Sequence, residues 1–222
     1  MAHNKTIQDV ENIGTYYSEI TDVFIEQYEK NGLKKHTQIF LDYFEREGIT
    51  GLSVLELGCG VGGLLLNFLD LGAEHAYGVD LSEKMIENAK GFAKLKKYEE
   101  KTNFYVGDFN SVKKNLLPIN QADIVVADRV LCCSPVPIEI VQNMIEFNPK
   151  YMVIVQPRKN YGYRAVMDLK IKIRHIQWKV KSHGTKIPFV AVKEYDKLCK
   201  DRGYKKVLTK YRYSWEVVIY KK

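Results

Sequence analysis

Three acidic residues, each near the end of a short apolar run, are the side chains of this sequence best suited to holding a polar ligand. Glu56 lies inside one run, Asp80 closes the next, and Asp108 follows the third. A carboxylate there can face a cation or accept hydrogen bonds from hydroxyl and amino groups. Asp80 follows Gly58 by 22 residues, the placement of an acid that binds ribose hydroxyls. The plainer interpretations are a structural acid for Glu56, a helix cap for Asp80 and a turn residue for Asp108.

A glycine turn separates the first apolar strand pattern from a helix pattern at 64–69. It reads Gly-Cys-Gly-Val-Gly-Gly over residues 58–63. Glycines permit positive φ and close approach of a ligand, and the helix N-terminus beyond them offers free N–H groups. The turn satisfies both G-x-G-x-x-G and G-x-G-x-G, so it predicts a nucleotide-binding unit but leaves the nucleotide open. Cys59 has no neighbour in sequence that would lower its pKa, and we do not expect it to be a nucleophile.

The segment after the fourth apolar run carries the candidate catalytic residues. It reads Asp-Arg-Val-Leu-Cys-Cys-Ser-Pro over residues 128–135. Asp128 and Arg129 are expected at the carboxyl end of a parallel strand, where Asp128 would bind a substrate or act as its general base. An Asp–Arg pair that only shapes the loop is the other interpretation. Cys132 and Cys133 are predicted to be small buried residues.

Alternating strand and helix patterns must position these residues. Five apolar runs read as strands, at 53–57, 76–80, 103–106, 123–127 and 151–155. Such an alternation predicts a parallel sheet with helices on both faces. Two helices are expected before the sheet. A helix and two strands are expected after it, at 192–202, 204–211 and 215–220.

The glycine turn and the three acids, in this order, resemble the class I S-adenosylmethionine-dependent methyltransferases. The resemblance implies an α/β fold with a Rossmann-like, seven-stranded, mostly parallel sheet and a C-terminal β-hairpin. It also implies S-adenosylmethionine as the cofactor, with Gly58, Cys59 and Gly60 against its methionine part. Glu56 matches the acid of the family's first motif.

The same resemblance assigns the remaining cofactor contacts. Asp80 would hold the ribose, and Leu81 would lie against the adenine. Asp108 would meet the adenine amino group while Phe109 covers the ring. Members of the family often close the site with an N-terminal helical segment, so Tyr17 is expected to fold over the cofactor. Core packing is the alternative for Tyr17.

Residues 128–133 are similar to the Asp-Arg-Val-Val-Cys-Cys-Tyr-Pro signature of a group of prokaryotic methyltransferases. That group is distantly like the magnesium-protoporphyrin O-methyltransferases, and the resemblance runs from about Leu33 through Trp215. Ser134 stands where the group has tyrosine, and Ala191 stands where a histidine is expected. The sequence lacks the Asn/Asp-Pro-Pro-aromatic motif and the Pro-Cys motif of enzymes that methylate amino groups and cytosine. Their absence favours a small-molecule acceptor.

Charge is distributed unevenly along the chain. Residues 1–157 carry 15 Lys and Arg against 22 Asp and Glu, whereas residues 158–222 carry 19 against 5. The excess of positive charge in residues 158–222 indicates an anionic partner, although a solvated lysine-rich surface is the plainer interpretation. The basic and aromatic segment 158–190 would suit a hydrophobic acceptor with an anionic group, or an anionic membrane surface. His175 and His183, both in this segment, are the only histidines that we expect near the acceptor.

Composition limits the class of protein. The mean hydropathy is −0.29, and no apolar stretch approaches the length of about 20 residues that a transmembrane helix needs. The four cysteines show no C-x-x-C spacing, so neither a zinc site nor a disulfide scaffold is expected, and the cytoplasm is the expected compartment. We predict one domain over 1–222, divided into a helical cap (1–50), a cofactor-binding core (51–157), an insertion (158–190) and a final helix with a hairpin (191–222).

The sequence therefore predicts methyl transfer from S-adenosylmethionine to an oxygen or nitrogen atom of a small, hydrophobic or anionic acceptor. One alternative is an RNA or protein methyltransferase that uses the basic C-terminal segment. Nucleic acid is the less favoured partner, because no RNP motif or separate RNA-binding domain is visible. The pattern is also compatible with a non-catalytic cofactor-binding protein or with an NAD-dependent oxidoreductase.

Overall fold

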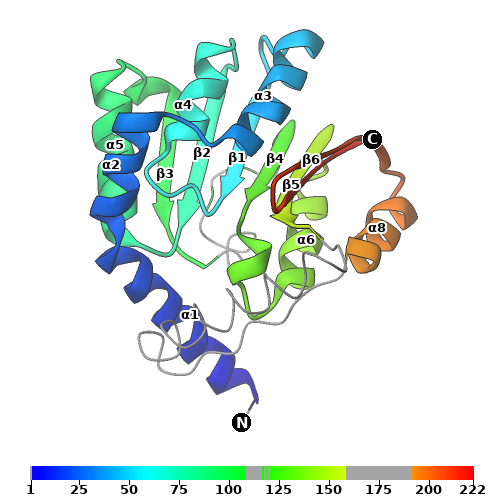
Figure 1. Ribbon diagram of the computed structural model, residues 1–222, viewed down its shortest axis with the longest axis horizontal. Coiled ribbons are helices and arrows are strands. Elements are labelled where there is room, and N and C mark those ends of the chain that lie inside the picture. The colour runs from blue at the N-terminus through cyan, green and yellow to red at the C-terminus, as the bar shows by residue number, and fades with distance from the viewer. Residues whose placement is uncertain (1, 109–116, 118, 120, 159–191) are drawn as a thin grey trace.

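The computed structural model describes residues 2–108, 117, 119, 121–158 and 192–222 (Figure 1). Its centre is a seven-stranded sheet with the order β3-β2-β1-β4-β5-β7-β6. The strands are β1 (Ser53–Leu57), β2 (His75–Asp80), β3 (Thr102–Val106), β4 (Ile124–Asp128), β5 (Tyr151–Pro157), β6 (Lys205–Arg212) and β7 (Trp215–Lys221). Strands β1 to β5 are parallel, and β7 is antiparallel to both β5 and β6. The predicted sheet with a C-terminal hairpin is confirmed.

Helices cover both faces of this sheet. They are α1 (Ala2–Glu19), α2 (Thr21–Asn31), α3 (Lys35–Glu47), α4 (Gly63–Asp70), α5 (Glu83–Leu95), α6 (Pro137–Glu146) and α8 (Val192–Asp201). Helices α3, α4 and α5 pack on one face, and α6 and α8 pack on the other. In Figure 1, α1 extends away from the body of the molecule. No helix in the described part of the chain is long and apolar enough to cross a membrane.

The central strands are apolar on both sides because both faces of the sheet are covered. In β4, Ile124 and Val126 belong to the core under α3 and α4, and Val125 and Ala127 belong to the core under α6. All four are fully buried. A near-continuous apolar run is what a parallel strand buried on two sides requires.

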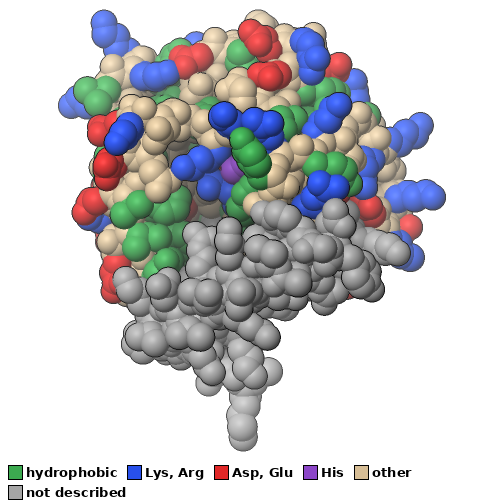
Figure 2. All heavy atoms as spheres, in the orientation of Figure 1, with side chains coloured by type: hydrophobic (Ala, Val, Ile, Leu, Met, Phe, Trp, Pro, Cys, Tyr) green, Lys and Arg blue, Asp and Glu red, His purple; other side chains and the backbone are tan. Residues whose placement is uncertain are grey.

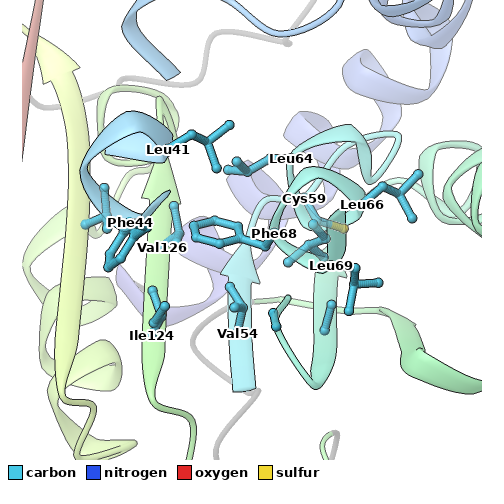
Figure 3. Packing of buried hydrophobic residues seen from close by; sticks show 14 of the residues in the cluster. Leu41, Phe44, Val54, Cys59, Leu64, Leu66, Phe68, Leu69, Ile124 and Val126 are labelled. Atoms are coloured by element: carbon cyan, nitrogen blue, oxygen red, sulfur yellow. The ribbon is translucent and has the colours of Figure 1, made fainter. Parts of the chain in front are cut away.

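Phe68 of α4 lies at the centre of the first core (Figure 3). Its ring centroid lies 5.5 Å from that of Phe44 and 6.3 Å from that of Phe40, both on α3. All three rings are fully buried, and each such burial stabilises the fold by about 2–3 kcal/mol. Packing of these rings fixes α3 on the sheet and so determines where its first turn lies.

Most element bounds lie within one or two residues of those predicted, and two larger differences have physical reasons. The chain before Asn31 forms two helices where one was expected, with a break at Ile20. The Thr21 hydroxyl donates to the carbonyl groups of Tyr17 and Ser18, at 3.0 and 3.1 Å, and such side-chain bonds bend helices. Strand β5 runs on to Pro157 because β7 pairs with it along that length. The helix expected within 158–185 lies outside the described residues.

The edge strand β6 bears part of the basic C-terminal charge. It carries Lys205, Lys206, Lys210 and Arg212, and Lys206 forms an ion pair with Asp196 at 2.7 Å. Lysines on an edge strand discourage pairing with another chain. On the face seen in Figure 2, Lys and Arg side chains are interspersed with Asp and Glu side chains. These charges are consistent with a solvated surface.

Candidate active site

A cavity of about 670 Å³ opens at the carboxyl ends of the parallel strands. It spans the point between β1 and β4 where the strand order reverses, the usual ligand position in open α/β sheets. Residues at the ends of β1, β2 and β3 form one end of the cavity, and residues of β4, β5 and β7 form the other end. Residues of α1, α2 and the start of α3 line the remaining sides. The predicted site residues that line it are Tyr17, Glu56, Gly58, Cys59, Gly60, Asp80, Leu81, Asp108, Asp128 and Arg129. Phe109 lies outside the described residues.

The glycine turn has the backbone conformation that its sequence predicts. Gly58 and Gly60 have φ values of 74° and 51°, in the left-handed region that favours glycine. The N–H groups of Gly58 and Cys59 donate to the Val79 carbonyl, at 2.7 and 3.0 Å, and hold the turn against β2. A Cβ on Gly60 would meet only the Met85 sulfur, at 4.0 Å. The turn therefore leaves room for a ligand against its backbone.

Asp80 links the glycine turn to the start of α5. Its Oδ2 accepts the N–H of Gly60 at 2.8 Å, and its Oδ1 accepts the N–H of Ser82 at 2.9 Å. The helix cap is Ser82, whose Oγ accepts the N–H of Met85 at 3.2 Å. Burial raises the pKa of Asp80, and the backbone N–H groups oppose that rise. Since a carboxylate offers about four acceptor positions, Asp80 can still bind ligand hydroxyls.

Glu56 is a buried acid with an oxygen left unpaired. The residue is 4% exposed, and its Oε2 has no hydrogen-bond partner among the described residues. Burial raises the pKa of Glu56 well above its ordinary value, and the negative charge of Asp128 adds to the rise. Burial disfavours the charged form of Glu56, and a positive charge beside it would favour that form. A positively charged group of a ligand in the cavity would therefore stabilise the carboxylate. Together with the open glycine turn, the carboxylate fits S-adenosylmethionine.

Helix α1 covers the cavity beside the loop that follows β2. A Cβ on Gly14 would lie 3.1 Å from the Leu81 carbonyl oxygen, so the helix backbone lies close to this loop. The Ser18 and Ser82 hydroxyl oxygens are 2.8 Å apart and join the same two segments. Tyr17, on α1, lines the cavity, and burial raises the pKa of its phenol well above the ordinary value. The phenol therefore remains a neutral hydrogen-bonding group at the cavity wall.

Asp128 ends β4, and both of its carboxylate oxygens are engaged. Oδ2 accepts the Thr37 hydroxyl at 2.7 Å, and Oδ1 accepts the Arg129 Nε–H at 3.1 Å. The residue is 9% exposed. The Asp–Arg pair that the sequence left open is therefore present, and Thr37 ties the pair to α3. A proton-accepting role for Asp128 stays a prediction.

His36 belongs to this cluster, and the sequence did not identify it. Its Nε2 lies 3.7 Å from Asp128 Oδ1, and its ring centroid lies 5.2 Å from that of Trp215, which lines the cavity. His36 is not among the residues that line the cavity, so the expectation that His175 and His183 are the histidines near the acceptor stays a prediction. Packing of α3 brings its first turn to the end of β4, which local sequence does not reveal. His175 and His183 lie outside the described residues.

Acidification is expected to destabilise the protein through His36. Burial lowers the pKa of His36 to about 4, and the charges of Arg129 and Lys34 add to the decrease. Asp128 opposes this change without overcoming it. Because the unfolded pKa is about 6.5, the unfolded chain binds more protons, and up to about 3 kcal/mol of stability is lost as pH falls towards 4. In thermal melts, His36→Phe should reduce this pH dependence.

An equal loss of stability on acidification in His36→Phe and in the wild type would contradict this role of His36. Phenylalanine keeps an aromatic ring beside Trp215 and cannot take up a proton.

Two adjacent thiols, those of Cys132 and Cys133, line the cavity beside Arg129. Their sulfur atoms are 3.7 Å apart, and Cys132 Sγ lies 3.3 Å from the Arg129 carbonyl oxygen. Both residues are half-buried, where full burial was predicted, because they form a short helix on the cavity wall. Burial raises the pKa of Cys59 well above its ordinary value, which makes it a poor nucleophile. Among the described residues, no three metal-ligating side chains form a cluster.

The sheet order and the cavity at its switch point, lined by the glycine turn and the acids, define the class of the protein. The class is the Rossmann-like, S-adenosylmethionine-dependent methyltransferases. A family described as a methyltransferase domain matches residues 50–200. The chain belongs to this methyltransferase domain family.

Solved structures share this fold, and a curated methyltransferase matches part of the chain. Magnesium protoporphyrin IX methyltransferase from Synechocystis PCC 6803, solved with bound SAH, has a TM-score of 0.73 at 19% identity, over 95% of this chain and 98% of that chain. The cyclase SpnF has a TM-score of 0.69 at 12% identity, over 96% of each chain. Ribosomal protein L11 methyltransferase of Haemophilus ducreyi is 25% identical over 136 residues, which are 61% of this chain and 41% of that protein. The match thus spans less than half of this relative. The expected likeness to magnesium-protoporphyrin methyltransferases is confirmed at the level of the fold.

Proposed function

We propose that this methyltransferase transfers the methyl group of S-adenosylmethionine to an oxygen or nitrogen atom of a small hydrophobic or anionic molecule. The observation that supports this most directly is the continuous cavity of about 670 Å³. Its size lies within the range of small-ligand sites, about 300–1,000 Å³. Its β4–β5 end combines a few polar groups with an apolar wall that includes Val130, Leu131, Pro157 and Trp215.

The residues of the other end would hold the cofactor. Glu56 would face a cationic group, Asp80 would accept hydrogen bonds from the ribose, and Leu81 and Asp108 would contact the adenine. Tyr17 would cover the ligand from α1. The bound cofactor supplies an activated methyl carbon, so the chain mainly has to orient the acceptor and exclude water.

Calorimetric titration with S-adenosylmethionine and S-adenosylhomocysteine, beside NADH and tRNA, tests the cofactor. Micromolar binding of both sulfur compounds and none of NADH is expected and would discard the oxidoreductase alternative. Failure to bind either sulfur compound would contradict the proposal. A labelled-methyl screen of a cell extract then tests the acceptor, because label in the small-molecule fraction is the expected result.

An RNA or protein acceptor is the second candidate, and the positive charge of residues 158–222 favours it. The match to ribosomal protein L11 methyltransferase points the same way. Against it, Lys206 and Lys221 of the described hairpin are already paired with Asp196 and Glu47, at 2.7 and 3.2 Å. Label confined to the RNA or protein fraction would favour this candidate. Cofactor binding without label in any fraction would favour a non-catalytic protein.

An anionic membrane surface is a further partner that we propose from the basic and aromatic composition of residues 158–190. Sedimentation with phosphatidylglycerol vesicles at low salt tests it, with phosphatidylcholine vesicles as the control. Equal sedimentation with both would contradict it.

A further inference from the structure

Arg129 has a strained backbone conformation that fixes its position at the cavity. Its φ of 64° lies in the left-handed region, which costs a non-glycine residue about 1–2 kcal/mol. Its N–H donates to the Val155 carbonyl oxygen at 2.9 Å, which holds the residue beside the end of β5. Such strain persists only where the surrounding structure imposes it, and it is frequent at ligand sites.

Asp128 occupies only one edge of the Arg129 guanidinium. The carboxylate accepts from Nε at 3.1 Å, while Thr37 holds its other oxygen at 2.7 Å. In the part of the chain that the structure describes, Asp128 is the acceptor found for this guanidinium, which leaves its two Nη groups for a ligand. The Arg129 side chain is 32% exposed and lines the cavity. The arginine is therefore positioned in advance, with donors directed to a ligand site.

A second cation, Lys34, lines the same cavity. Its Nζ donates to Gln27 Oε1 at 2.6 Å, and this neutral amide does not compensate its charge. Arg129 and the carboxylate of Asp128 thus lie at the β4–β5 end, and Lys34 lies on the adjoining wall at the start of α3. Asp80 and Asp108, which are predicted to bind the cofactor, follow β2 and β3 at the other end. This charge distribution favours a cationic cofactor at one end and an anionic acceptor at the other.

We propose that Arg129 binds a carboxylate of the methyl acceptor through its Nη groups, with Lys34 as a second positive charge. The inference rests on the proposed function and narrows its substrate class to an apolar molecule that bears a carboxylate. A planar guanidinium matches a carboxylate in two parallel hydrogen bonds, and these bonds gain strength beside an apolar wall. In this role Arg129 determines which acceptor binds and how it is oriented. Arg129 takes no part in the methyl transfer itself.

The test uses the whole protein saturated with S-adenosylhomocysteine and two probes of similar shape, 1-naphthoate and 1-naphthamide. Calorimetry is expected to show naphthoate binding at least about tenfold more tightly. Arg129→Gln should abolish this preference, with the Kd of S-adenosylhomocysteine kept within about threefold. Arg129→Lys should retain part of it, since the charge remains without the planar fork. Arg202→Gln, a change at an exposed arginine after α8, is the matched control and should keep the full preference.

Equal binding of the two probes, binding of neither, or a preference that survives in Arg129→Gln would overturn the inference. The first titration distinguishes this failure from failure of the proposed function. A protein that binds S-adenosylhomocysteine but does not prefer naphthoate retains the function and loses the inference, whereas absence of S-adenosylhomocysteine binding contradicts the function itself. Arg129→Gly, which adopts positive φ without strain, is a second variant in case the glutamine variant fails to fold.

Discussion

Replacing Glu56 with Gln is expected to stabilise the ligand-free protein and to weaken its binding of S-adenosylmethionine. Glu56 is 4% exposed, and its Oε2 has no partner among the described residues, so folding buries a carboxylate oxygen without a hydrogen bond, and the charge of Arg129 offsets only part of the cost. A neutral amide of the same shape reduces that cost, and we expect a gain of about 1–2 kcal/mol. The cationic cofactor loses its counter-charge, and its Kd should rise about tenfold to a hundredfold. Thermal melts and calorimetric titration measure the two effects.

The pH dependence of stability gives an independent check on Glu56. Burial raises the pKa of Glu56 well above its ordinary value and also raises that of Asp80. The folded protein therefore binds these protons more tightly than the unfolded chain does. The contribution of these two carboxyl groups to the stability of the ligand-free protein should fall as pH rises from the ordinary carboxyl pKa of about 4 through the raised values, opposite in sign to the contribution of His36. Glu56→Gln should reduce this loss of stability with rising pH, and the loss that remains in the variant should come from Asp80.

Glu45→Gln is the matched control, because Glu45 is exposed on α3 and does not line the cavity. It should change neither the melting temperature nor the cofactor Kd. If Glu56→Gln left the Kd unchanged, Glu56 would be a structural acid, the alternative that the sequence left open. If it lowered the melting temperature, the carboxylate would have a compensating partner in the ligand-free protein.

The end of the cavity where we place the cofactor could be predicted from local sequence because its acids lie at or just beyond the carboxyl ends of apolar strands. In a parallel sheet, the carboxyl ends of the strands meet at the same edge, so Glu56, Asp80 and Asp108 had to come together once the strands were identified. The glycine turn could also be predicted, since Gly58 and Gly60 have positive φ values, which few other residues adopt. At this end of the cavity, the positions of the acids and of the glycine turn in the sequence are sufficient to predict their positions in the fold.

The β4–β5 end could be predicted only in part because it is assembled from distant segments. Thr37 meets Asp128 across 91 residues, and Trp215 arrives from the C-terminal hairpin. The docking of α3 is determined by side-chain packing against the sheet, which no local pattern encodes. The sequence did contain one indication. His36 and Thr37 precede Phe40 and Leu41 by four residues each, and this helical spacing places two polar residues on the buried face of α3. Polar residues at such positions need partners, and Thr37 has its partner in Asp128.

The two roles that the sequence left open for Asp128 make different demands on its carboxylate. A general base needs an oxygen that can reach the proton of the acceptor. A positioning residue needs both oxygens committed to neighbouring groups. The contacts of Oδ2 with Thr37 and of Oδ1 with Arg129 satisfy the second demand. The positioning role is therefore the one that we expect experiments to support.

Asp128→Ala is expected to destabilise the protein by about 3 kcal/mol. It leaves Arg129 without its counter-charge and the Thr37 hydroxyl without its acceptor. Removing one partner of a buried pair costs about 3–5 kcal/mol, and the 32% exposure of the Arg129 side chain places this case at the lower end. The double variant Asp128→Ala/Arg129→Gln should be more stable than Asp128→Ala, because no charge is left unpaired. Urea unfolding measures each difference, and equal stabilities of these two variants would contradict the pairing.

Asp128→Asn distinguishes between the two roles in the assembled enzyme. The amide still offers Thr37 an acceptor, but it neither balances Arg129 nor takes up a proton. If Asp128 positions Arg129, the KM for the acceptor found by the labelled-methyl screen should rise about tenfold, with a smaller change in kcat. Asp123→Asn is the control, because Asp123 binds Ser53 at 2.8 and 2.7 Å at the opposite ends of the strands and should alter stability alone. A fall in kcat of about a hundredfold or more with an unchanged KM would instead make Asp128 the general base.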